Sequence, residues 1–292
     1  MKRNKTNIFI HIFFIIASVV FLVPFIIIVS ASFTDELALL DNGYKLIPSK
    51  FSMLAYKYLF KNPQIIIDSY LITILATIVG TFVSVLLMTM ASYTLSRNNC
   101  KFRKAFSFYI FFTMLFSGGL VPSYILTTQY LHLQDTVWVL ILAGLINPFY
   151  IIMIRTFFKQ LPDSLFEAAK LDGASESIIF FRIVIPLSKP VIATIAFMIT
   201  LGRWNDWYTP LLYITEKKLM PLQYLLYKMM ANLQFLLSSM KDAPQMNFDI
   251  TQIPGENLRM AMLIVATGPM LFVFPFFQKY FTKGLTIGAV KG

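Results

Sequence analysis

The sequence is poor in the residues that most enzymes use for metal binding and nucleophilic chemistry. Its 292 residues include one cysteine, Cys100, and two histidines, His11 and His132. One cysteine excludes an intramolecular disulfide, and two distant histidines with no second ligand nearby form no metal-binding pattern. The chain also lacks the G-x-x-x-x-G-K-[S/T] loop that cradles nucleotide phosphates. We therefore expect no catalytic residue, no metal and no cofactor bound by this chain.

Charged residues are scarce as well. Asp, Glu, Lys and Arg make up 13% of the chain, whereas hydrophobic residues make up 57% of it. A soluble domain of this size needs charged groups to cover its surface, and too few are present. The composition therefore predicts an integral membrane protein whose main solvent is lipid.

Apolar runs long enough to cross a bilayer as helices, about 20 residues each, occur six times. They cover residues 8–32, 69–96, 105–126, 137–157, 190–213 and 260–282. Because backbone groups in lipid must be bonded within the segment, we predict an all-α fold of six transmembrane helices. The expected parts are an N-terminal anchor with the first outer loop (1–68), a core (69–282) and a C-terminal tail (283–292).

The first run also resembles a signal peptide, because it ends near Ser30, Ala31 and Ser32. Its apolar stretch from Ile8 to Val29 is longer than the core of a signal peptide, about 7–15 residues. This length favours a retained anchor.

Basic residues are distributed unevenly between the two sides that the six segments define. With the N-terminus inside, fifteen Lys and Arg and four carboxylates fall inside, against eight and nine outside. Cytoplasmic loops carry such an excess of Lys and Arg, so the net charge of +11 is a topology signal and not a nucleic-acid site. We expect a multi-pass cell-membrane protein with both termini and residues 158–189 in the cytoplasm, and residues 214–259 outside.

Small residues and helix breakers occur inside several segments. Ala76, Gly80 and Ser84 recur every four residues, a pattern that lets helix backbones approach closely. Glycine and proline at residues 118–122 and 268–275 predict interrupted helices. Such breaks occur where neighbours or a cavity satisfy the freed backbone groups, so a transport pathway and simple packing kinks both stay open.

The fifth segment carries the most costly polar residues for a membrane. An arginine costs about 3 kcal/mol at the centre of a span and normally faces the bundle interior or a water-filled cavity. One interpretation is a substrate path in which tryptophans stack on sugar rings and Asn205 and Asp206 form hydrogen bonds with the substrate. The other is an Arg–Asp pair at the membrane interface beside an aromatic belt. The candidate residues are Arg203, Trp204, Asn205, Asp206 and Trp207.

A polar insert, FEAAKLDGASESIIFFRIVIP at residues 166–186, interrupts the apolar chain. Ser164 and Glu167 fit a capping box, Gly173 fits a helix stop, and a second short helix should begin at Ser175. A solvated loop needs no alanine pair or glycine turn, and an interfacial anchor would show a more basic face. A docking element fits best, because alanines allow close approach of a partner protein and carboxylates accept hydrogen bonds from its arginines.

The insert also resembles a known motif. The spacing of Glu167-Ala168-Ala169, Gly173, Ile183 and Ile185-Pro186 resembles the EAA motif of binding-protein-dependent ABC importer permeases, with Ile185 where that family more often has leucine. WNDWYTPLLY (204–213) and KGLTIGAVKG (283–292) resemble the maltose-type carbohydrate-uptake branch. FSGGLVPSY and GLINPFYIIMIRTFF are similar to its subgroup for oligosaccharides and polysaccharide fragments. The likeness covers roughly residues 69–292.

The resemblance implies a transport subunit and not an enzyme, with ATP and Mg on a partner ATPase. The implied coupling residues are Glu167, Ala168, Ala169, Asp172, Gly173 and Pro186. The implied contacts of the tail with the ATPase are Gly284, Leu285, Thr286, Gly288, Lys291 and Gly292. The implied partners are a second homologous permease subunit, two cytoplasmic ATPase subunits and an extracytoplasmic substrate-binding protein. The implied substrate is a carbohydrate, moved by alternating access.

Two alternatives stay open on the residues alone. An integral-membrane scaffold or enzyme subunit with a cytoplasmic docking helix pair would need the EAA spacing by chance. A secondary transporter is disfavoured because Asp206 is the one acidic residue in the middle of a segment and no inverted repeat is evident. The sequence does not identify the sugar.

Overall fold

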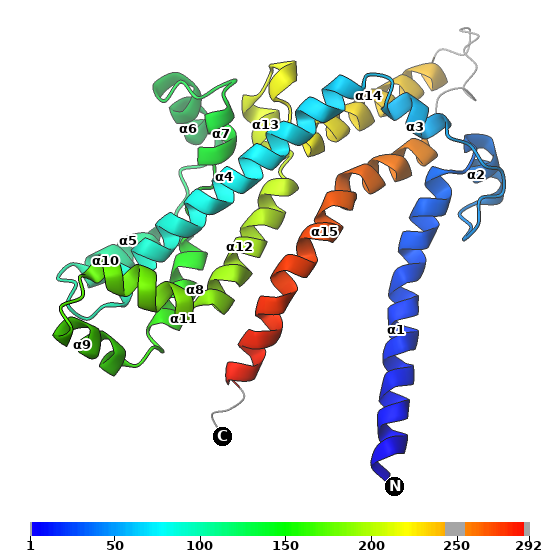
Figure 1. Ribbon diagram of the computed structural model, residues 1–292. Helices are drawn as coiled ribbons and strands as arrows, with labels where there is room; N and C mark the ends of the chain where they lie inside the picture. Colours follow the sequence, from blue (N-terminus) through cyan, green and yellow to red (C-terminus); the bar gives the residue numbers. More distant parts are fainter. Residues whose placement is uncertain (1, 243–254, 289–292) are drawn as a thin grey trace. The chain divides into compact units, whose positions relative to one another are not determined.

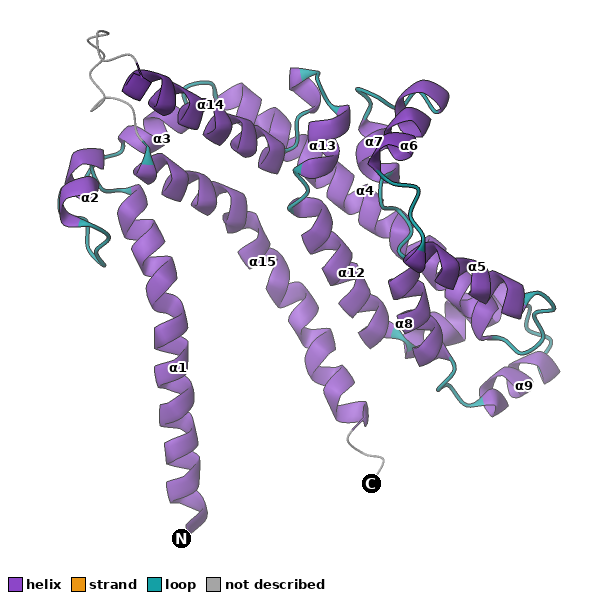
Figure 2. Cartoon of the chain, turned by 180° about the vertical axis from the view of Figure 1, so that it is seen from behind, coloured by secondary structure: helices purple, strands orange, loops and turns teal. Residues whose placement is uncertain are grey.

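The computed structural model describes residues 2–242 and 255–288. Within them every regular element is a helix, and one isolated bridge pairs Thr34 with Phe51. Figure 2 shows the helices and the loops that join them. The predicted all-α class is therefore confirmed for the described part of the chain. Two compact units are distinguished, Met1–Ile67 with Leu225–Pro269, and Asp68–Tyr224 with Met270–Gly292.

The first unit contains the N-terminal helix and the segments that pack near its end. Its elements are α1 (Lys2–Ser32), α2 (Glu36–Asn42), α3 (Leu54–Leu59), most of α14 (Leu222–Asp242) and the first part of α15 (Glu256–Gly288). The carboxylate of Glu36 accepts hydrogen bonds from the backbone N–H groups of Glu256 (2.9 Å) and Asn257 (3.1 Å). It thereby pairs two of the N–H groups that the start of α15 leaves without an intrahelical partner.

The second unit is built around α4 (Pro63–Ser96), a helix of 34 residues whose first turn belongs to the first unit. Figure 1 shows α4 as one uninterrupted cyan helix. The other elements are α5 (Arg103–Leu115), α6 (Leu120–Ile125), η1 (Leu126–Tyr130), α7 (Val137–Leu142), α8 (Pro148–Phe158), α9 (Asp163–Leu171), α10 (Glu176–Ile179), η2 (Phe180–Val184), α11 (Ile185–Leu187), α12 (Lys189–Trp204), α13 (Tyr208–Tyr213), η3 (Lys217–Leu219), the first residues of α14 and the rest of α15.

Three described helices are long and apolar enough to cross a membrane, namely Ile8–Ser32, Pro63–Ser96 and Glu256–Gln278. Two further pairs qualify together but are bent, Arg103–Leu115 with Leu120–Tyr130 by 112° and Glu176–Leu187 with Lys189–Trp204 by 81°. The described residues therefore provide three spans, or up to five if each bent pair is one span.

Three of the six predicted segments are not continuous helices, and the break was predicted in only one of these three. The segments 105–126, 137–157 and 190–213 are each divided into two helices by a short break. The break predicted at residues 118–122 is confirmed, because α5 ends at Leu115 and Gly119 has a φ of +88°. The break predicted at residues 268–275 is wrong, since α15 runs through Gly268, Pro269 and Pro275. Spanning helices tolerate such residues when local adjustments satisfy the freed backbone groups.

The larger core of the second unit includes several residues of the polar insert. Ile154, Ile179, Val184 and Ile195 are completely buried there, and Phe166 of α9 packs into the same cluster. The insert is therefore a packed part of this unit and not a loose loop.

Candidate functional site

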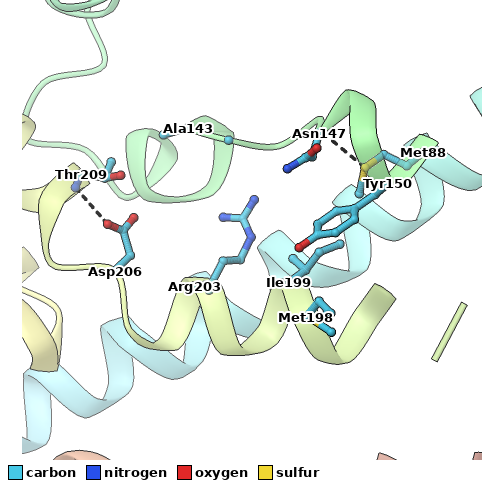
Figure 3. A pocket seen from close by; sticks show the side chains of 11 residues that line it. Met88, Ala143, Asn147, Tyr150, Met198, Ile199, Arg203, Asp206 and Thr209 are labelled. Atoms are coloured by element: carbon cyan, nitrogen blue, oxygen red, sulfur yellow. Dashed lines mark hydrogen bonds between the residues drawn. The ribbon is translucent and has the colours of Figure 1, made fainter. Parts of the chain in front are cut away.

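A cavity of about 250 Å³ lies where two of the divided segments are broken. One break, residues 143–147, separates α7 from α8, and the other, residues 205–207, separates α12 from α13. Figure 3 shows the side chain of Arg203 rising from α12 between Asp206 and Tyr150. The lining residues are Met88, Ala143, Gly144, Asn147, Tyr150, Met198, Ile199, Gly202, Arg203, Asp206 and Thr209. Broken helices around a polar cavity are the arrangement in which many transporters bind substrates and ions.

The break between α7 and α8 is encoded locally. Gly144 has a φ of +63°, a left-handed conformation that favours glycine. Asn147 then starts α8, because its side-chain oxygen accepts a hydrogen bond from the N–H of Phe149 (2.9 Å). Pro148 follows at the first helical position, where its missing N–H costs nothing. The Asn-Pro pair could have predicted this helix start from the sequence.

Arg203 bonds to the end of α7. Its Nη1 donates to the carbonyl of Leu140 (2.9 Å) and its Nη2 donates to the carbonyl of Ile141 (3.0 Å). These carbonyls belong to the last turn of α7, so the guanidinium supplies donors that the broken helix lacks and places positive charge at its C-terminus. The large cost of an arginine within a membrane protein is offset here by hydrogen bonds to backbone groups that also need partners.

The row of small residues on α4 accommodates the same arginine. A Cβ added to Gly80 would lie 2.5 Å from Arg203 Cζ, and Ser84 Oγ accepts a hydrogen bond from Arg203 Nη2 (3.1 Å). The spacing of Ala76, Gly80 and Ser84 predicted close approach of two helix backbones. At Gly80 and Ser84 the partner is instead a guanidinium, which requires a flat, small surface beside it.

Asp206 stabilises the helix on the other side of the second break. Its Oδ1 accepts hydrogen bonds from the N–H groups of Tyr208 (3.1 Å) and Thr209 (3.0 Å), at the start of α13. A carboxylate is favourable at a helix N-terminus, as a guanidinium is at a C-terminus. Arg203 and Asp206 therefore serve the ends of two different helices.

The five residues proposed for a substrate path separate in the structure. Arg203 and Asp206 line the cavity, whereas Trp204 is 5% exposed and lies 6.4 Å from the ring of Tyr70. Asn205 donates to the carbonyl of Leu201 and accepts from Gln223. Trp207 is exposed and packs edge-on against Tyr208. Trp204, Asn205 and Trp207 are not among the lining residues, while Asn147, Tyr150 and Thr209, which sequence reasoning missed, are.

The polar insert folds as two short helical segments. α9 ends at Leu171 and Gly173 has a φ of +76°, which confirms the predicted glycine stop. The predicted start at Ser175 is also confirmed, because its Oγ accepts a hydrogen bond from the N–H of Ile178 (3.4 Å). The predicted capping box at Ser164 is wrong, since α9 already begins at Asp163, after Pro162, and no side chain caps it.

The exposed face of α9 differs from the simple alanine surface that the motif suggested. Glu167, Ala168, Asp172 and Gly173 are exposed, but Ala169 is 8% exposed and packs into the core of this unit. Ala169 therefore cannot offer its side chain to a partner. Leu171, which sequence reasoning missed, is 89% exposed. Pro186 is exposed in α11.

The other predicted residues lie near the end of the chain. Gly284, Leu285, Thr286 and Gly288 belong to the last turns of α15, whereas Lys291 and Gly292 lie outside the described residues.

Among residues 2–242 and 255–288, no group of three His, Cys, Asp or Glu side chains is placed to hold a metal ion. Helices broken around a polar cavity, in a unit that also presents a helix pair with an exposed face, are typical of a membrane protein of the transport class.

Comparison with known proteins identifies the family. The family described as binding-protein-dependent transport system inner membrane component matches residues 1–287. Protein LplC of Bacillus subtilis (strain 168) is 40% identical over 274 residues, which cover 93% of this chain and 90% of that protein. The polygalacturonan/rhamnogalacturonan transport system permease protein YtcP of the same organism is 38% identical over 292 residues, with 100% of both chains covered.

A solved structure is similar as well. The crystal structure of a bacterial ABC transporter involved in the import of the acidic polysaccharide alginate matches with a TM-score of 0.77 and 27% identity, over 95% of this chain and 97% of that chain. This chain therefore belongs to the family of binding-protein-dependent transport system inner membrane components. Membership confirms the resemblance carried by the EAA spacing and makes the chain a transport permease of an ABC importer, not an enzyme. It also implies a permease partner, an ATPase and a substrate-binding protein.

Proposed function

We propose that this chain moves an oligosaccharide or related carbohydrate inward by alternating access, driven by a separate ATPase subunit. The observation that carries the proposal is the full-length likeness to YtcP, whose name specifies polygalacturonan/rhamnogalacturonan transport. More distant relatives point the same way, since they include arabinooligosaccharide and trehalose/maltose transport permeases.

The cavity at the two helix breaks is the proposed sugar path in this chain. Asn147, Tyr150 and Thr209 offer polar groups suited to sugar hydroxyls, and Met88 and Met198 add apolar surface. Its volume of about 250 Å³ is below the 300–1,000 Å³ typical of complete small-molecule sites. We therefore propose that a second, homologous permease subunit completes the site. Arg203 and Asp206 shape the cavity by holding the helix ends that border it.

The exposed face of α9 is the proposed contact with the ATPase. Leu171 is exposed in a segment predicted to be cytoplasmic, and Glu167, Ala168 and Asp172 are exposed on the same helix. Leu171 would give a partner an apolar anchor, and the carboxylates of Glu167 and Asp172 would accept hydrogen bonds from its basic residues. We propose one such contact for each of two ATPase subunits, with the tail from Gly284 to Gly292 as a second contact.

The proposed topology has six spans with both termini in the cytoplasm. The three long helices and the bent pair Arg103–Leu115 with Leu120–Tyr130 would supply four spans. Lys189–Trp204 with α13 would supply the fifth, which leaves Glu176–Leu187 in the cytoplasmic insert. The sixth would be α7 with α8, which together cover the predicted segment 137–157. The outer loop at residues 214–259 would then face the substrate-binding protein.

Uptake measurements test the proposed function. A strain that lacks this chain should fail to accumulate labelled oligosaccharides that the parent strain imports, and the cloned chain should restore uptake. Oligogalacturonides, arabino-oligosaccharides and maltose should be compared, because the names of relatives specify transport of polygalacturonan/rhamnogalacturonan, arabinooligosaccharides and trehalose/maltose. Unchanged ATP-dependent uptake of every oligosaccharide in the deletion strain would contradict the proposal.

A further inference from the structure

Polar side chains at one end of α4 bond to both arms of the polar insert. The hydroxyl of Tyr93 donates a hydrogen bond to Glu176 Oε2 at the start of α10. The same carboxylate pairs with Lys170 Nζ of α9 through Oε1, at 2.8 Å. Just beyond the end of α4, Arg97 lies with its guanidinium carbon 3.8 Å from the ring centroid of Phe166, in α9. Tyr93 of α4 thus holds α10, and Arg97, just beyond the end of α4, holds α9.

Burial makes the Tyr93 contact specific. Tyr93 is 8% exposed, and its ring lies 5.3 Å from that of Phe180. A buried tyrosine hydroxyl requires a hydrogen-bond partner, and a charged acceptor makes a stronger bond than a neutral one. By contrast, Lys170 and Glu176 are 40% and 55% exposed, so their ion pair alone contributes little. The bond to Tyr93 is therefore the contact that fixes Glu176.

The contact of Arg97 with Phe166 is also largely buried, like the contact of Tyr93 with Glu176. The Arg97 side chain is 18% exposed and Phe166 is 4% exposed, so the cation lies against a buried ring. A cation over an aromatic face is attracted more strongly when it is shielded from water. Its ion pair with Asp163 is long, at 4.0 Å, and the Asp163 side chain is 73% exposed. Stacking on Phe166 is the stronger of the two Arg97 contacts.

The same helix also forms a wall of the cavity. Ser84 accepts a hydrogen bond from Arg203, and the sulfur of Met88 accepts one from the N–H of Asn147 (3.4 Å). Tyr93 follows Ser84 by nine residues in an unbroken helix, so the two are separated by about 14 Å along its axis. One rigid element therefore contacts the cavity border at one level and the polar insert at another.

We propose that Tyr93 and Arg97 are positioning residues that make the insert and α4 move together, so that force on α9 displaces the cavity wall. The inference rests on the proposed function, because it assumes that an ATPase docks on α9. Neither residue belongs to the exposed docking face of α9. Their loss should leave ATPase binding intact and reduce the sugar moved for each ATP hydrolysed.

The test compares variants in the complete transporter, reconstituted in liposomes with its ATPase, partner permease and binding protein. Tyr93→Phe removes the hydroxyl alone and should lower the sugar moved per ATP by about tenfold, the change in an equilibrium expected for one hydrogen bond to a charged group. Tyr109→Phe is the matched control, since Tyr109 is 66% exposed on α5, and it should behave as wild type.

Conservative variants separate positioning from simple stabilisation. Glu176→Gln keeps an acceptor for Tyr93 and should retain most coupling, whereas Glu176→Ala should lose it. Arg97→Lys keeps a cation over Phe166 and should exceed Arg97→Gln in coupling.

A wild-type ratio of sugar moved to ATP hydrolysed in Tyr93→Phe and Arg97→Gln would overturn the inference while leaving the proposed function intact. Failure of Tyr93→Phe and Glu176→Gln to assemble would also overturn it, by assigning the network a role in folding. If the wild-type complex shows no sugar-stimulated ATP hydrolysis, the proposed function itself fails.

Discussion

The guanidinium of Arg203 lies against Gly80, at a position where a Cβ on residue 80 would be 2.5 Å from Arg203 Cζ. Arg203 cannot withdraw freely, because it also donates to the carbonyls of Leu140 and Ile141. Three helices are thus joined through one side chain. Gly80 is therefore needed to leave room for Arg203 at the border of the cavity, and not only for helix packing.

Gly80→Ala should displace Arg203 and impair transport. The added methyl group meets the middle of the guanidinium, and overpacking of this kind costs about 1–3 kcal/mol. Thermal unfolding of the purified complex and sugar uptake would both report the loss. Gly268→Ala is the matched control, because a Cβ on that helical glycine meets nothing within 4 Å. Equal stability and uptake in the two variants would contradict the arrangement.

Arg203→Lys should be defective although it preserves the charge. A lysine has a single ammonium group and cannot reproduce the planar fork that reaches two carbonyls and Ser84. Each buried carbonyl left without a donor costs about 1–3 kcal/mol. The prediction is checked by the unfolding temperature and by increased amide exchange at the end of α7. Wild-type exchange at Leu142 and Ala143 would show that Arg203 does not hold this helix end.

Changes on α9 should separate docking from folding. Leu171→Asp should weaken ATPase association at least about tenfold, because a large exposed aliphatic anchor becomes charged. The variant should still insert and unfold like wild type, since Leu171 is 89% exposed. Gly173→Pro should disrupt the turn itself, because φ is +76° there and proline requires about −65°. Pull-down of the ATPase with each purified variant measures the effect, and wild-type affinity of Leu171→Asp would exclude the proposed face.

The stability of the contact between the loop before α7 and residues 215–216 should depend on pH. Asp135 accepts hydrogen bonds from the hydroxyl and N–H of Thr215 (both 2.6 Å) and from the N–H of Glu216 (2.9 Å). The bond to the Thr215 hydroxyl is the main cause that lowers the pKa of the Asp135 carboxyl below its ordinary value of 3.8. The unfolded chain thus takes up this proton at higher pH than the folded chain. The stabilisation is present above pH 3.8 and is lost as the pH falls through the lower folded value.

Hydrogen exchange near Thr215, corrected for its intrinsic pH dependence, measures this effect. Protection should decrease on acidification from about pH 5 to pH 3 in the wild type. Asp135→Asn lacks the titrating group and should show less protection at neutral pH without that acid-dependent step. An identical pH profile in the two proteins would contradict the assignment.

The single cysteine tests the proposed topology. Cys100 is partly exposed between α4 and α5, on the side predicted to be cytoplasmic. A membrane-impermeant maleimide should label it in inside-out vesicles and not in intact cells. Lys57→Cys in a Cys100→Ser background is the matched control and should show the opposite pattern. Labelling of folded Cys100 in intact cells would invert the topology.

Local sequence chemistry was sufficient for some of these features. The glycine stop at Gly173 and the cap at Ser175 were predictable because each depends on a few adjacent residues. The helix breaks at residues 143–147 and 205–207 were not predicted, since a long apolar run obscures them in sequence. The Asn-Pro pair at Asn147 was a readable signal for the first. The continuity of α15 through Pro269 could not be read locally, because it depends on how surrounding groups satisfy the backbone.

The sequence by itself determined that this protein is helical and lies in a membrane, because few charges and long apolar runs leave no other way to satisfy the backbone. It also determined the helix pair and its family motif, which are contiguous in the chain. Only the tertiary structure decided that Ala168 faces outward while Ala169 is buried, and that Arg203 meets Gly80, Leu140 and Ile141. The reason is physical: burial and hydrogen bonding between distant residues depend on how helices pack, which no local pattern specifies.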